Sequence, residues 1–271
     1  MSRTNHRIPL VAGNWKMNLD HVEAIHLLQA LALRLRTTDT TKVEVSVHPP
    51  FTDLRSVEGI IGADELPITL GAQHCSHLES GAFTGEVSVG MLRRLSVKMV
   101  LVGHSERREL YGMTDEVVAQ TAGAVLSGGL IAVVCVGETA EQRDAGETNE
   151  VLTRQVTAAL AGVPKGAEAS VLFAYEPIWA IGTGVAATEV DAQVACAHIR
   201  SVISSERSAS VADVMRILYG GSAKPDNAGD LVAQEDVDGL LVGGASLDAE
   251  SFSAMIDAVA ACYGSPAGNG K

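Results

Sequence analysis

The sequence lacks any run of basic residues. Its 271 residues include 20 Lys and Arg against 33 Asp and Glu, so the formal net charge is −13 at pH 7. Nucleic acids and anionic membrane surfaces attract proteins through clustered positive charge. The sequence therefore predicts neither a nucleic acid nor a membrane as partner. An anionic substrate would have to be attracted by a few local groups.

Long apolar segments are also missing. Residues 1–7 are polar and precede an apolar run of only five residues, which is too short for a secretory signal and predicts a cytoplasmic protein. The stretch 117–137 has no charged residue over 21 positions. However, Gly128 and Gly129 divide it, so we expect a helix end followed by a strand at 130–136 rather than a membrane span.

Cysteine is scarce and scattered. Cys75, Cys135, Cys196 and Cys262 form no Cys-x-x-Cys pair and no cluster with histidine. This spacing indicates reduced structural thiols rather than a disulfide framework or a zinc site. The composition, 46% hydrophobic and 20% charged, is typical of a globular protein. No linker divides the chain, so we predict one domain over 1–262 and a disordered Gly/Pro-rich tail over 263–271.

Short apolar runs recur along the chain, each followed by a stretch with helical patterning. The eight runs are 8–13, 43–48, 68–73, 99–104, 131–138, 170–176, 215–221 and 239–244. Continuous apolarity is typical of strands covered on both faces, which favours parallel pairing. The runs repeat about every 33 residues, as in βα units. Eight such units favour a closed α/β architecture, the (β/α)8 barrel, over an open doubly wound sheet.

Two helices carry recognisable start signals. Apolar residues at helical spacing over 20–36 follow a possible cap at Asp20, and Thr188 precedes a run to Arg200 with acidic residues in its first turn. Polar side chains end several of the apolar runs, where the carboxyl ends of barrel strands meet at one rim. These residues are Asn14, Lys16, Gln73, His104, Glu138 and Glu176. Residues more than 160 positions apart in sequence can therefore share one pocket at this rim.

Three of these rim residues have side chains suited to chemistry. Lys16 is the only basic residue directly after a strand, where it could attract an anion and neutralise developing charge. His104 precedes Ser105 and Glu106, which could begin a helix; its N–H groups would disfavour imidazolium and leave a neutral ring able to donate a hydrogen bond. Glu176 has apolar sequence neighbours and is a candidate for a desolvated general base.

Glycine-containing loops follow the sixth, seventh and eighth strands. Residues 178–181 lie between Pro177 and the Gly-Thr-Gly sequence 182–184, which suggests a compact lid with a stiff and a permissive hinge. The pattern Gly-x-Gly-x-x-Ala at 182–187 does not directly follow a strand, which argues against a dinucleotide site. The glycine pairs at 220–221 and 243–244, with Ser222 as a donor, are typical of a phosphate site.

The motifs occur together in one order. GNWKMN (13–18), GHSERR (103–108), YEPIWAIGTG (175–184), YGGS (219–222) and VGGASL (242–247) resemble the triosephosphate isomerase family in order and spacing, over nearly the whole chain. The resemblance implies these roles: substrate binding and electrostatic stabilisation for Asn14 and Lys16, a neutral electrophile in His104, a base in Glu176, a supporting carboxylate in Glu106, and a phosphate site at Gly182, Ser222, Gly243 and Gly244.

The segment from Gly71 to Glu86 resembles the protruding dimer loop of the family. The resemblance implies a homodimer in which Thr84 reaches toward the neighbour's site. The loop is long and contains apolar Leu78 and Phe83, which also favours burial against a second copy. Met113 departs from the family, because many members carry an acidic residue there. This leaves the partner of Arg107 undetermined.

The resemblance implies a cofactor-free and metal-free isomerase of triose phosphates. Dihydroxyacetone phosphate and D-glyceraldehyde 3-phosphate would interconvert through an enediolate, in glycolysis, gluconeogenesis and the pentose shunt. Two alternatives remain at this point. One is a Schiff-base aldolase on a similar barrel with Lys16 as nucleophile. The other is a non-catalytic protein that binds a phosphate ligand.

Overall fold

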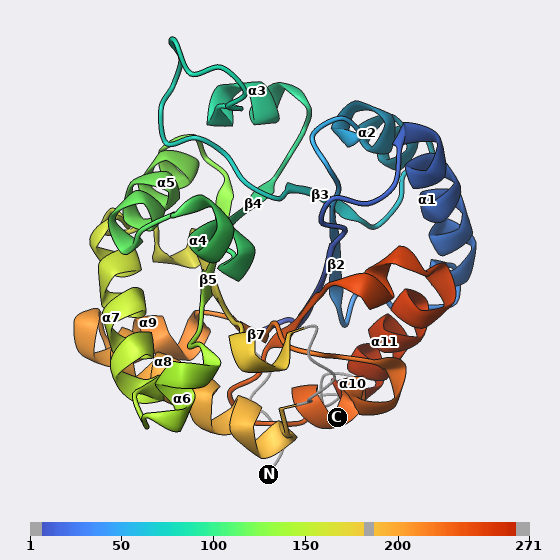
Figure 1. The fold of residues 1–271 in the computed structure, drawn as a ribbon. Helices are drawn as coiled ribbons and strands as arrows, with labels where there is room; N and C mark the ends of the chain where they lie inside the picture. Colours follow the sequence, from blue (N-terminus) through green and yellow to red (C-terminus); the bar gives the residue numbers. More distant parts are fainter. Residues whose placement is uncertain (1–6, 182–186, 264–271) are drawn as a thin grey trace, which may run out of the picture.

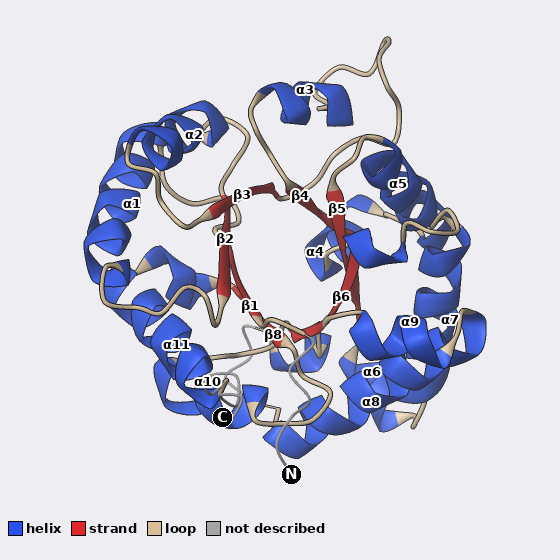
Figure 2. Cartoon of the chain, turned by 180° about the vertical axis from the view of Figure 1, so that it is seen from behind, coloured by secondary structure: helices blue, strands red, loops and turns tan. Residues whose placement is uncertain are grey.

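The chain folds into one closed barrel of eight parallel strands, as the eight apolar runs predict. The computed structural model describes residues 7–181 and 187–263. Each strand pairs with the next in sequence, and β8 pairs back onto β1. The view along the barrel axis shows the strands as an inner ring and the helices as an outer ring (Figures 1 and 2).

Every predicted run overlaps one observed strand. The strands are β1 (Leu10–Asn14), β2 (Glu44–His48), β3 (Thr69–Ala72), β4 (Met99–Val102), β5 (Ile131–Val136), β6 (Val171–Tyr175), β7 (Ile217–Tyr219) and β8 (Gly239–Val242). Most polar residues at the ends of the runs lie just beyond the strands, in the loops of the carboxyl-end rim. The barrel therefore brings residues from distant parts of the sequence to one rim.

Helices connect the strands on the outside. The α-helices are α1 (His21–Leu35), α2 (Leu54–Ala63), α3 (Val89–Arg94), α4 (Ser105–Tyr111), α5 (Asp115–Ser127), α6 (Ala140–Asp144), α7 (Thr148–Ala161), α8 (Glu189–Glu206), α9 (Ala209–Val214), α10 (Pro225–Val232) and α11 (Ala249–Cys262). Three short 3-10 helices complete the described chain: η1 (Glu168–Ser170), η2 (Ile178–Ala180) and η3 (Gly244–Leu247).

The predicted helix starts are confirmed by their caps. Asp20 accepts the backbone N–H groups of Val22 and Glu23, and the Glu23 side chain accepts the N–H of Asp20, which makes a reciprocal capping box. Thr188 caps α8 in the same way through Asp191. This helix continues to Glu206, beyond the predicted end at Arg200, because apolar residues such as Val202 and Ile203 still face the core.

The uncharged stretch 117–137 divides as predicted. Most of α5 and all of β5 lie within it, separated by a turn at Gly128 and Gly129, where Gly129 has a positive φ of 73°. Within residues 7–181 and 187–263, no helix is both long enough and apolar enough to cross a membrane.

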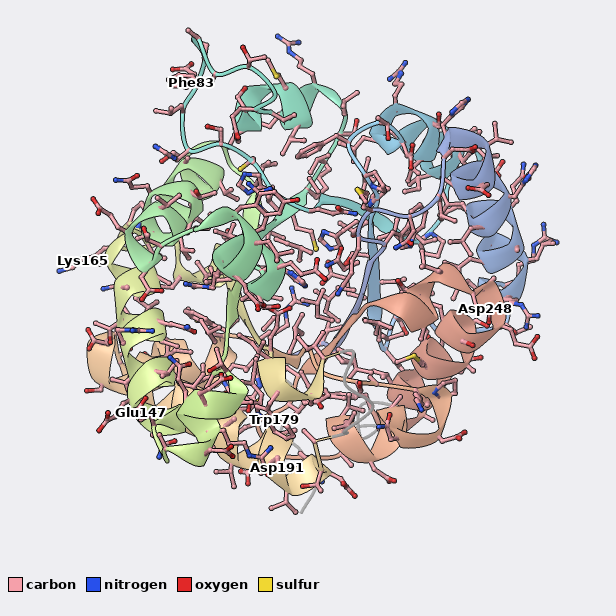
Figure 3. The ribbon with its side chains drawn as sticks, in the orientation of Figure 1. Phe83, Glu147, Lys165, Trp179, Asp191 and Asp248 are labelled. Carbon is pink, nitrogen blue, oxygen red and sulfur yellow. The ribbon has the colours of Figure 1, made fainter. Side chains whose placement is uncertain are left out.

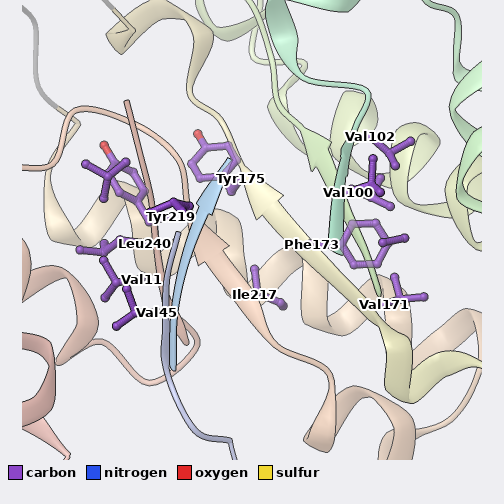
Figure 4. Packing of buried hydrophobic residues seen from close by; sticks show 14 of the residues in the cluster. Val11, Val45, Val100, Val102, Val171, Phe173, Tyr175, Ile217, Tyr219 and Leu240 are labelled. Atoms are coloured by element: carbon purple, nitrogen blue, oxygen red, sulfur yellow. The ribbon is translucent and has the colours of Figure 1, made fainter. Parts of the chain in front are cut away.

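The core has two layers because strand side chains alternate between the barrel interior and the helices. Residues such as Leu10, Met99 and Leu172 fill the interior. Their strand neighbours, including Val11 and Phe173, pack outward against the helices (Figure 4). The filled interior closes the barrel below the carboxyl-end rim, so a ligand can be received only at an end.

Two predicted features lie at or beyond the described boundaries. Of the predicted tail 263–271, the structure describes only Tyr263, which is buried in the outer layer. Residues 71 and 72 of the predicted loop belong to β3, so the loop itself begins at Gln73. From there to α3 the chain projects beyond the ring of helices (Figures 1 and 2).

Candidate active site

A pocket of about 350 Å³ opens at the carboxyl-end rim. Loops after β1, β4, β6, β7 and β8 line it. Its lining includes seven of the predicted residues: Asn14, Lys16, His104, Glu176, Ser222, Gly243 and Gly244. Residues up to 230 positions apart in sequence thus meet in one cavity, as the barrel architecture predicts. What each residue does there remains a prediction.

Lys16 is held in an unusual backbone conformation. Its φ of 53° lies in the left-handed region, which is uncommon for a residue with a side chain. Two side chains fix it: the Asn14 Oδ1 accepts the Lys16 N–H at 3.0 Å, and the Gln73 amide donates to the Lys16 carbonyl at 2.7 Å. Such local strain persists where the surroundings hold it, often at functional sites. The Lys16 ammonium donates to Glu106 at 2.6 Å, so Glu106 supports Lys16 from outside the pocket lining.

His104 caps helix α4, as the sequence predicts. Its Nδ1 faces the Glu106 N–H at 3.3 Å in an acceptor position. The other ring nitrogen, Nε2, lies 2.9 Å from Oε1 of Glu176. The hydrogen bonds therefore assign the ring proton to Nε2, which is the nitrogen that faces the pocket. This tautomer is the one that a neutral hydrogen-bond donor requires.

Glu176 follows β6 directly and is only 2% exposed. Besides the contact with His104, its Oε2 accepts the backbone N–H of Ser105 at 2.9 Å. The glycines at the neighbouring strand ends let the backbones approach it. A Cβ on Gly137 would stand 1.8 Å from the Glu176 carbonyl oxygen, so only glycine fits there. The carboxylate is thus held at the pocket wall by two donors on one loop.

The two groups shift each other's protonation. Burial by itself lowers the pKa of His104, but the facing Glu176 carboxylate outweighs burial and raises it. Burial by itself raises the pKa of Glu176, but His104 and the Ser105 hydrogen bond lower it. The helix terminus predicted a lowered pKa for His104, because the contact with Glu176 cannot be inferred from the local sequence around His104. These donors therefore favour the ionised form of Glu176.

The predicted lid is described only in part. Ile178 to Ala180 form η2, and the Trp179 Nε1–H donates to Glu138 at 2.8 Å. The Tyr175 hydroxyl donates to the same carboxylate, whose pKa is raised by burial. The Arg143 guanidinium stacks 3.4 Å from the centre of the Trp179 ring. Figure 3 shows Trp179 near Asp191 at the edge of the barrel. Gly182, predicted to bind phosphate, lies outside the described residues.

The glycine loops form the opposite wall of the pocket. A Cβ on Gly244 would meet nothing within 4 Å, and one on Gly243 would come within 3.6 Å only of the Lys16 side chain. Ser222 donates its hydroxyl to the Ala180 carbonyl at 3.1 Å, which connects this wall to the first residues of the lid. Exposed backbone in these loops is suited to bind the oxygens of a phosphate.

Thr84 does not line the pocket of its own chain. It lies in the projecting loop next to Phe83, a residue that is 45% exposed near the loop tip (Figure 3). At the base of this loop, His74 lies 3.3 Å from Arg107, whose guanidinium stacks on Tyr111. These contacts, rather than a carboxylate at position 113, hold the Arg107 side chain in the described structure.

Sequence reasoning missed three contributors to the site. Gln73 was noted at a strand end, but its hold on Lys16 depends on a contact between separate loops. The Ser105 backbone N–H leaves no trace in the side-chain pattern. Lys16, the only basic residue directly after a strand, is not the only cation among the described pocket residues, because Lys224 also lines the pocket. Its position two residues after Ser222, just beyond the predicted phosphate loop, is a signal for it in the sequence.

Comparisons with known proteins agree with this geometry. The family model described as triosephosphate isomerase matches residues 9–259. A protein of Corynebacterium efficiens with that name is 52% identical over 249 residues, which cover 92% of this chain and 95% of the relative. Proteins with the same name from Mycobacteroides abscessus and Mycobacterium tuberculosis are 51% and 50% identical, each with the same coverage of both chains.

Proposed function

The chain belongs to the triosephosphate isomerase family, and from that premise we propose that Glu176, His104 and Lys16 carry its reaction. The enzyme interconverts dihydroxyacetone phosphate and D-glyceraldehyde 3-phosphate. This reaction moves a proton between two adjacent carbons and shifts the carbonyl from one to the other. It therefore needs a base beside the carbons and a donor beside the oxygens.

Glu176 is the base in this proposal. The substrate enters the pocket, and the carboxylate exchanges its bonds to His104 and Ser105 for contact with the carbon next to the carbonyl. His104 and the Ser105 N–H no longer stabilise the ionised form once Glu176 has moved away from them. Burial then raises the pKa of the carboxylate, so its affinity for the proton increases. Glu176 takes the proton from one carbon and returns it to the other, and the carboxylate ends as it began.

His104 and Lys16 stabilise the charge that develops on oxygen. When the proton leaves carbon, its electron pair moves to the carbonyl oxygen and forms an enediolate. The Nε2–H of His104 and the Lys16 ammonium line the same cavity and are suited to donate to that oxygen. Because these donors are fixed by a helix cap and by Asn14 and Gln73, little reorganisation is needed when the charge appears.

The phosphate group of the substrate occupies the glycine-lined side. Ser222, Gly243 and Gly244 bind its oxygens in this proposal, and Gly182 is proposed as a further contact. Asn14 lines the same pocket and holds the Lys16 backbone. Binding energy from the phosphate then positions the reacting carbons beside Glu176, as remote groups do in other enzymes.

Neither alternative is favoured. A Schiff-base nucleophile must present a free amine, whereas the Lys16 ammonium donates to Glu106 at 2.6 Å. A passive phosphate-binding protein would have no need for a buried carboxylate opposite a histidine. The single observation that carries the proposal is the 2.9 Å contact of Glu176 with His104 in a cavity that Lys16 also lines.

A coupled isomerase assay on Glu176→Asp tests the role of the base. The shorter side chain withdraws the carboxylate by roughly an ångström, and a misplacement of that size costs about 100-fold in kcat. Glu147→Asp is the matched control, because Glu147 lies at the start of α7 on the periphery of the barrel (Figure 3). Equal kcat values for the two variants would rule out Glu176 as the base.

We also propose that the enzyme works as a homodimer through the loop from Gly71 to Glu86. Leu78 and Phe83 on this loop and Tyr111 on α4 leave large apolar surfaces exposed in the single chain. A second copy would cover them, and Thr84 would then reach the partner's Asn14 and Lys16. On this view the dimer is needed for activity as well as for stability.

Phe83→Asp tests the dimer proposal when mass in solution and activity are measured together. The charge should yield a folded monomer with a strongly reduced kcat. Val190→Asp, at an even more exposed apolar position on α8, should leave a fully active dimer. A Phe83→Asp protein that is still dimeric, or a monomer with full activity, would contradict the proposal.

The cytoplasm is the location that we propose, with glycolysis, gluconeogenesis and the pentose shunt as the pathways that use the reaction. Cys75, Cys135 and Cys196 are buried as reduced thiols, which suits a reducing compartment.

A further inference from the structure

Two lysines line the active-site pocket, but they differ in their surroundings. Lys16 lies on the side of β1 and already donates to Glu106 at 2.6 Å. Lys224 lies on the side of β7 and is exposed, and no described carboxylate lies within ion-pair distance of its ammonium. The positive charge of Lys224 is therefore the less compensated of the two.

The backbone at Lys224 is fixed from both sides. Pro225 begins α10 and restricts the preceding residue to extended conformations; Lys224 has φ −136° and ψ 164°. The Asn227 side chain accepts the Lys224 N–H at 2.8 Å. Asn227 also donates to the carbonyl of Ser222 at 3.4 Å, so the same side chain connects Lys224 to the glycine loop. The start of the Lys224 side chain is thus held at the rim beside Ser222.

The overall charge of the protein makes a local cation important. A net charge of −13 repels a phosphate dianion at long range. Lys16 offsets this repulsion only in part, because its positive charge is partly neutralised by the Glu106 carboxylate. Lys224 lines the same pocket as the glycine loops, so its uncompensated charge attracts the dianion toward the place where its phosphate would bind.

We propose that Lys224 is a second cation of the phosphate site, which captures the phosphate group of the substrate and strengthens its binding. The inference rests on the proposed placement of the phosphate at Ser222, Gly243 and Gly244. Lys16 acts at the reacting oxygens, whereas Lys224 acts on the part of the substrate that does not react. The effect of Lys224 should therefore appear in KM and in phosphate affinity rather than in kcat.

The test compares Lys224→Gln with Lys165→Gln. Both variants lose one positive charge, but Lys165 lies between α7 and β6, at the opposite end of the barrel and on its outer edge (Figure 3). A calorimetric titration with inorganic phosphate measures binding without turnover. We expect Lys224→Gln to weaken phosphate binding and raise KM about fivefold, since two unit charges 4 Å apart in water change a binding constant by roughly that factor.

Salt dependence and a charge-preserving variant complete the test. The decline of kcat/KM with ionic strength should be shallower in Lys224→Gln than in Lys165→Gln, and Lys224→Arg should restore phosphate affinity to within about twofold. Equal affinities in Lys224→Gln and Lys165→Gln, or a Lys224→Arg variant as weak as Lys224→Gln, would overturn the proposal. If the unmodified protein had no isomerase activity, the proposed function would be contradicted instead.

Discussion

The two ends of the barrel both bury charged side chains, but they arrange them differently. At the amino end, Asp238 accepts from Arg7, from Arg200 and from the backbone N–H of Ile217. Arg200 also bonds to Asp236 and to backbone carbonyls. At the carboxyl end, Glu176 has two donors and Lys16 has a single carboxylate partner.

This difference indicates that the amino end stabilises the fold, whereas the carboxyl end is arranged to bind a ligand. A charge with many fixed partners is costly to disturb, so the amino-end network holds β1, β7 and β8 together. A charge with one or two partners can exchange them for a ligand. The carboxyl end also contains the strained Lys16 backbone and buried oxygens of Glu138 and Tyr219 that lack a partner within the described residues. Substitutions at one end of the barrel at a time should therefore affect either activity or stability.

The largest effect is expected from Glu176→Gln. The amide keeps the shape of the side chain but cannot take up a proton, so kcat should fall about 10³- to 10⁴-fold. The free energy of unfolding should fall less than after a change in the amino-end network, because the amide oxygen can still accept the Ser105 N–H and no amino-end contact is touched. Steady-state kinetics and urea unfolding of the same preparation measure the two effects. If Glu176→Gln lost as much stability as a variant of the amino-end network, the two ends would not differ in the way described.

The opposite pattern is expected from Asp238→Asn at the amino end. Removing one charge from the network leaves Arg7 and Arg200 without their shared partner, at a cost of about 3–5 kcal/mol in the free energy of unfolding. The folded fraction should keep its kcat. Asp213→Asn is the control, because it changes another partner of Arg7 that is largely exposed, and should cost no more than about 1 kcal/mol. Similar losses in both variants would refute the network argument.

Acid should act on the carboxyl end through His48, at the end of β2. Burial lowers the pKa of its ring to about 4, and its partners, Ser46 and the Ala72 carbonyl, are uncharged. Between pH 6.5 and 4 the unfolded chain therefore binds a proton that the folded chain does not. Stability should fall by about 3 kcal/mol over this interval.

His48→Gln removes that titration, so its unfolding free energy should depend less on pH between 6.5 and 4 than that of the unmodified protein. Urea midpoints at several pH values measure the slope. His74, whose pKa burial also lowers to about 4, contributes with the same sign and leaves a residual slope. An unchanged slope in His48→Gln would show that His48 is not the responsible group.

A smaller effect is expected from Gly71→Ala. A Cβ at this position in β3 would stand 2.2 Å from the His48 ring, so the ring must shift, at a cost of about 1–3 kcal/mol. Gly59→Ala in α2 is the control, since its Cβ would meet nothing within 4 Å and alanine favours the helix. Thermal unfolding of both variants should give shifts of opposite sign, and a stabilised Gly71→Ala would contradict the packing argument.

The fold could be predicted because its signals are local and repeated. Continuous apolar runs predicted all eight strands, and Asp20 and Thr188 predicted two helix starts from their capping chemistry. The strand ends were less accurate, since Asn14 belongs to β1 and the run from residue 215 becomes a strand only at Ile217. Hydrogen bonding between strands, which the sequence does not display, sets these ends.

The site could be predicted as a set of residues but not as a set of contacts. The barrel rule brings His104, Glu176 and Lys16 to one rim, and the pocket contains all three. The sequence could not show that Glu176 faces His104, because that contact depends on rotamers in two separate loops. For the same reason the predicted shift in the pKa of His104 has the wrong sign. Lys224, in contrast, is indicated by its position two residues after Ser222.

Transfer of deuterium from solvent tests the central claim, that the carboxyl end is built for proton exchange by Glu176. The unmodified enzyme and Glu176→Gln are incubated with dihydroxyacetone phosphate in D₂O, and NMR follows deuterium at the carbon beside the carbonyl. The account predicts rapid incorporation with the unmodified enzyme and about 10³-fold slower incorporation with Glu176→Gln. Equal rates of incorporation in the two proteins would contradict it.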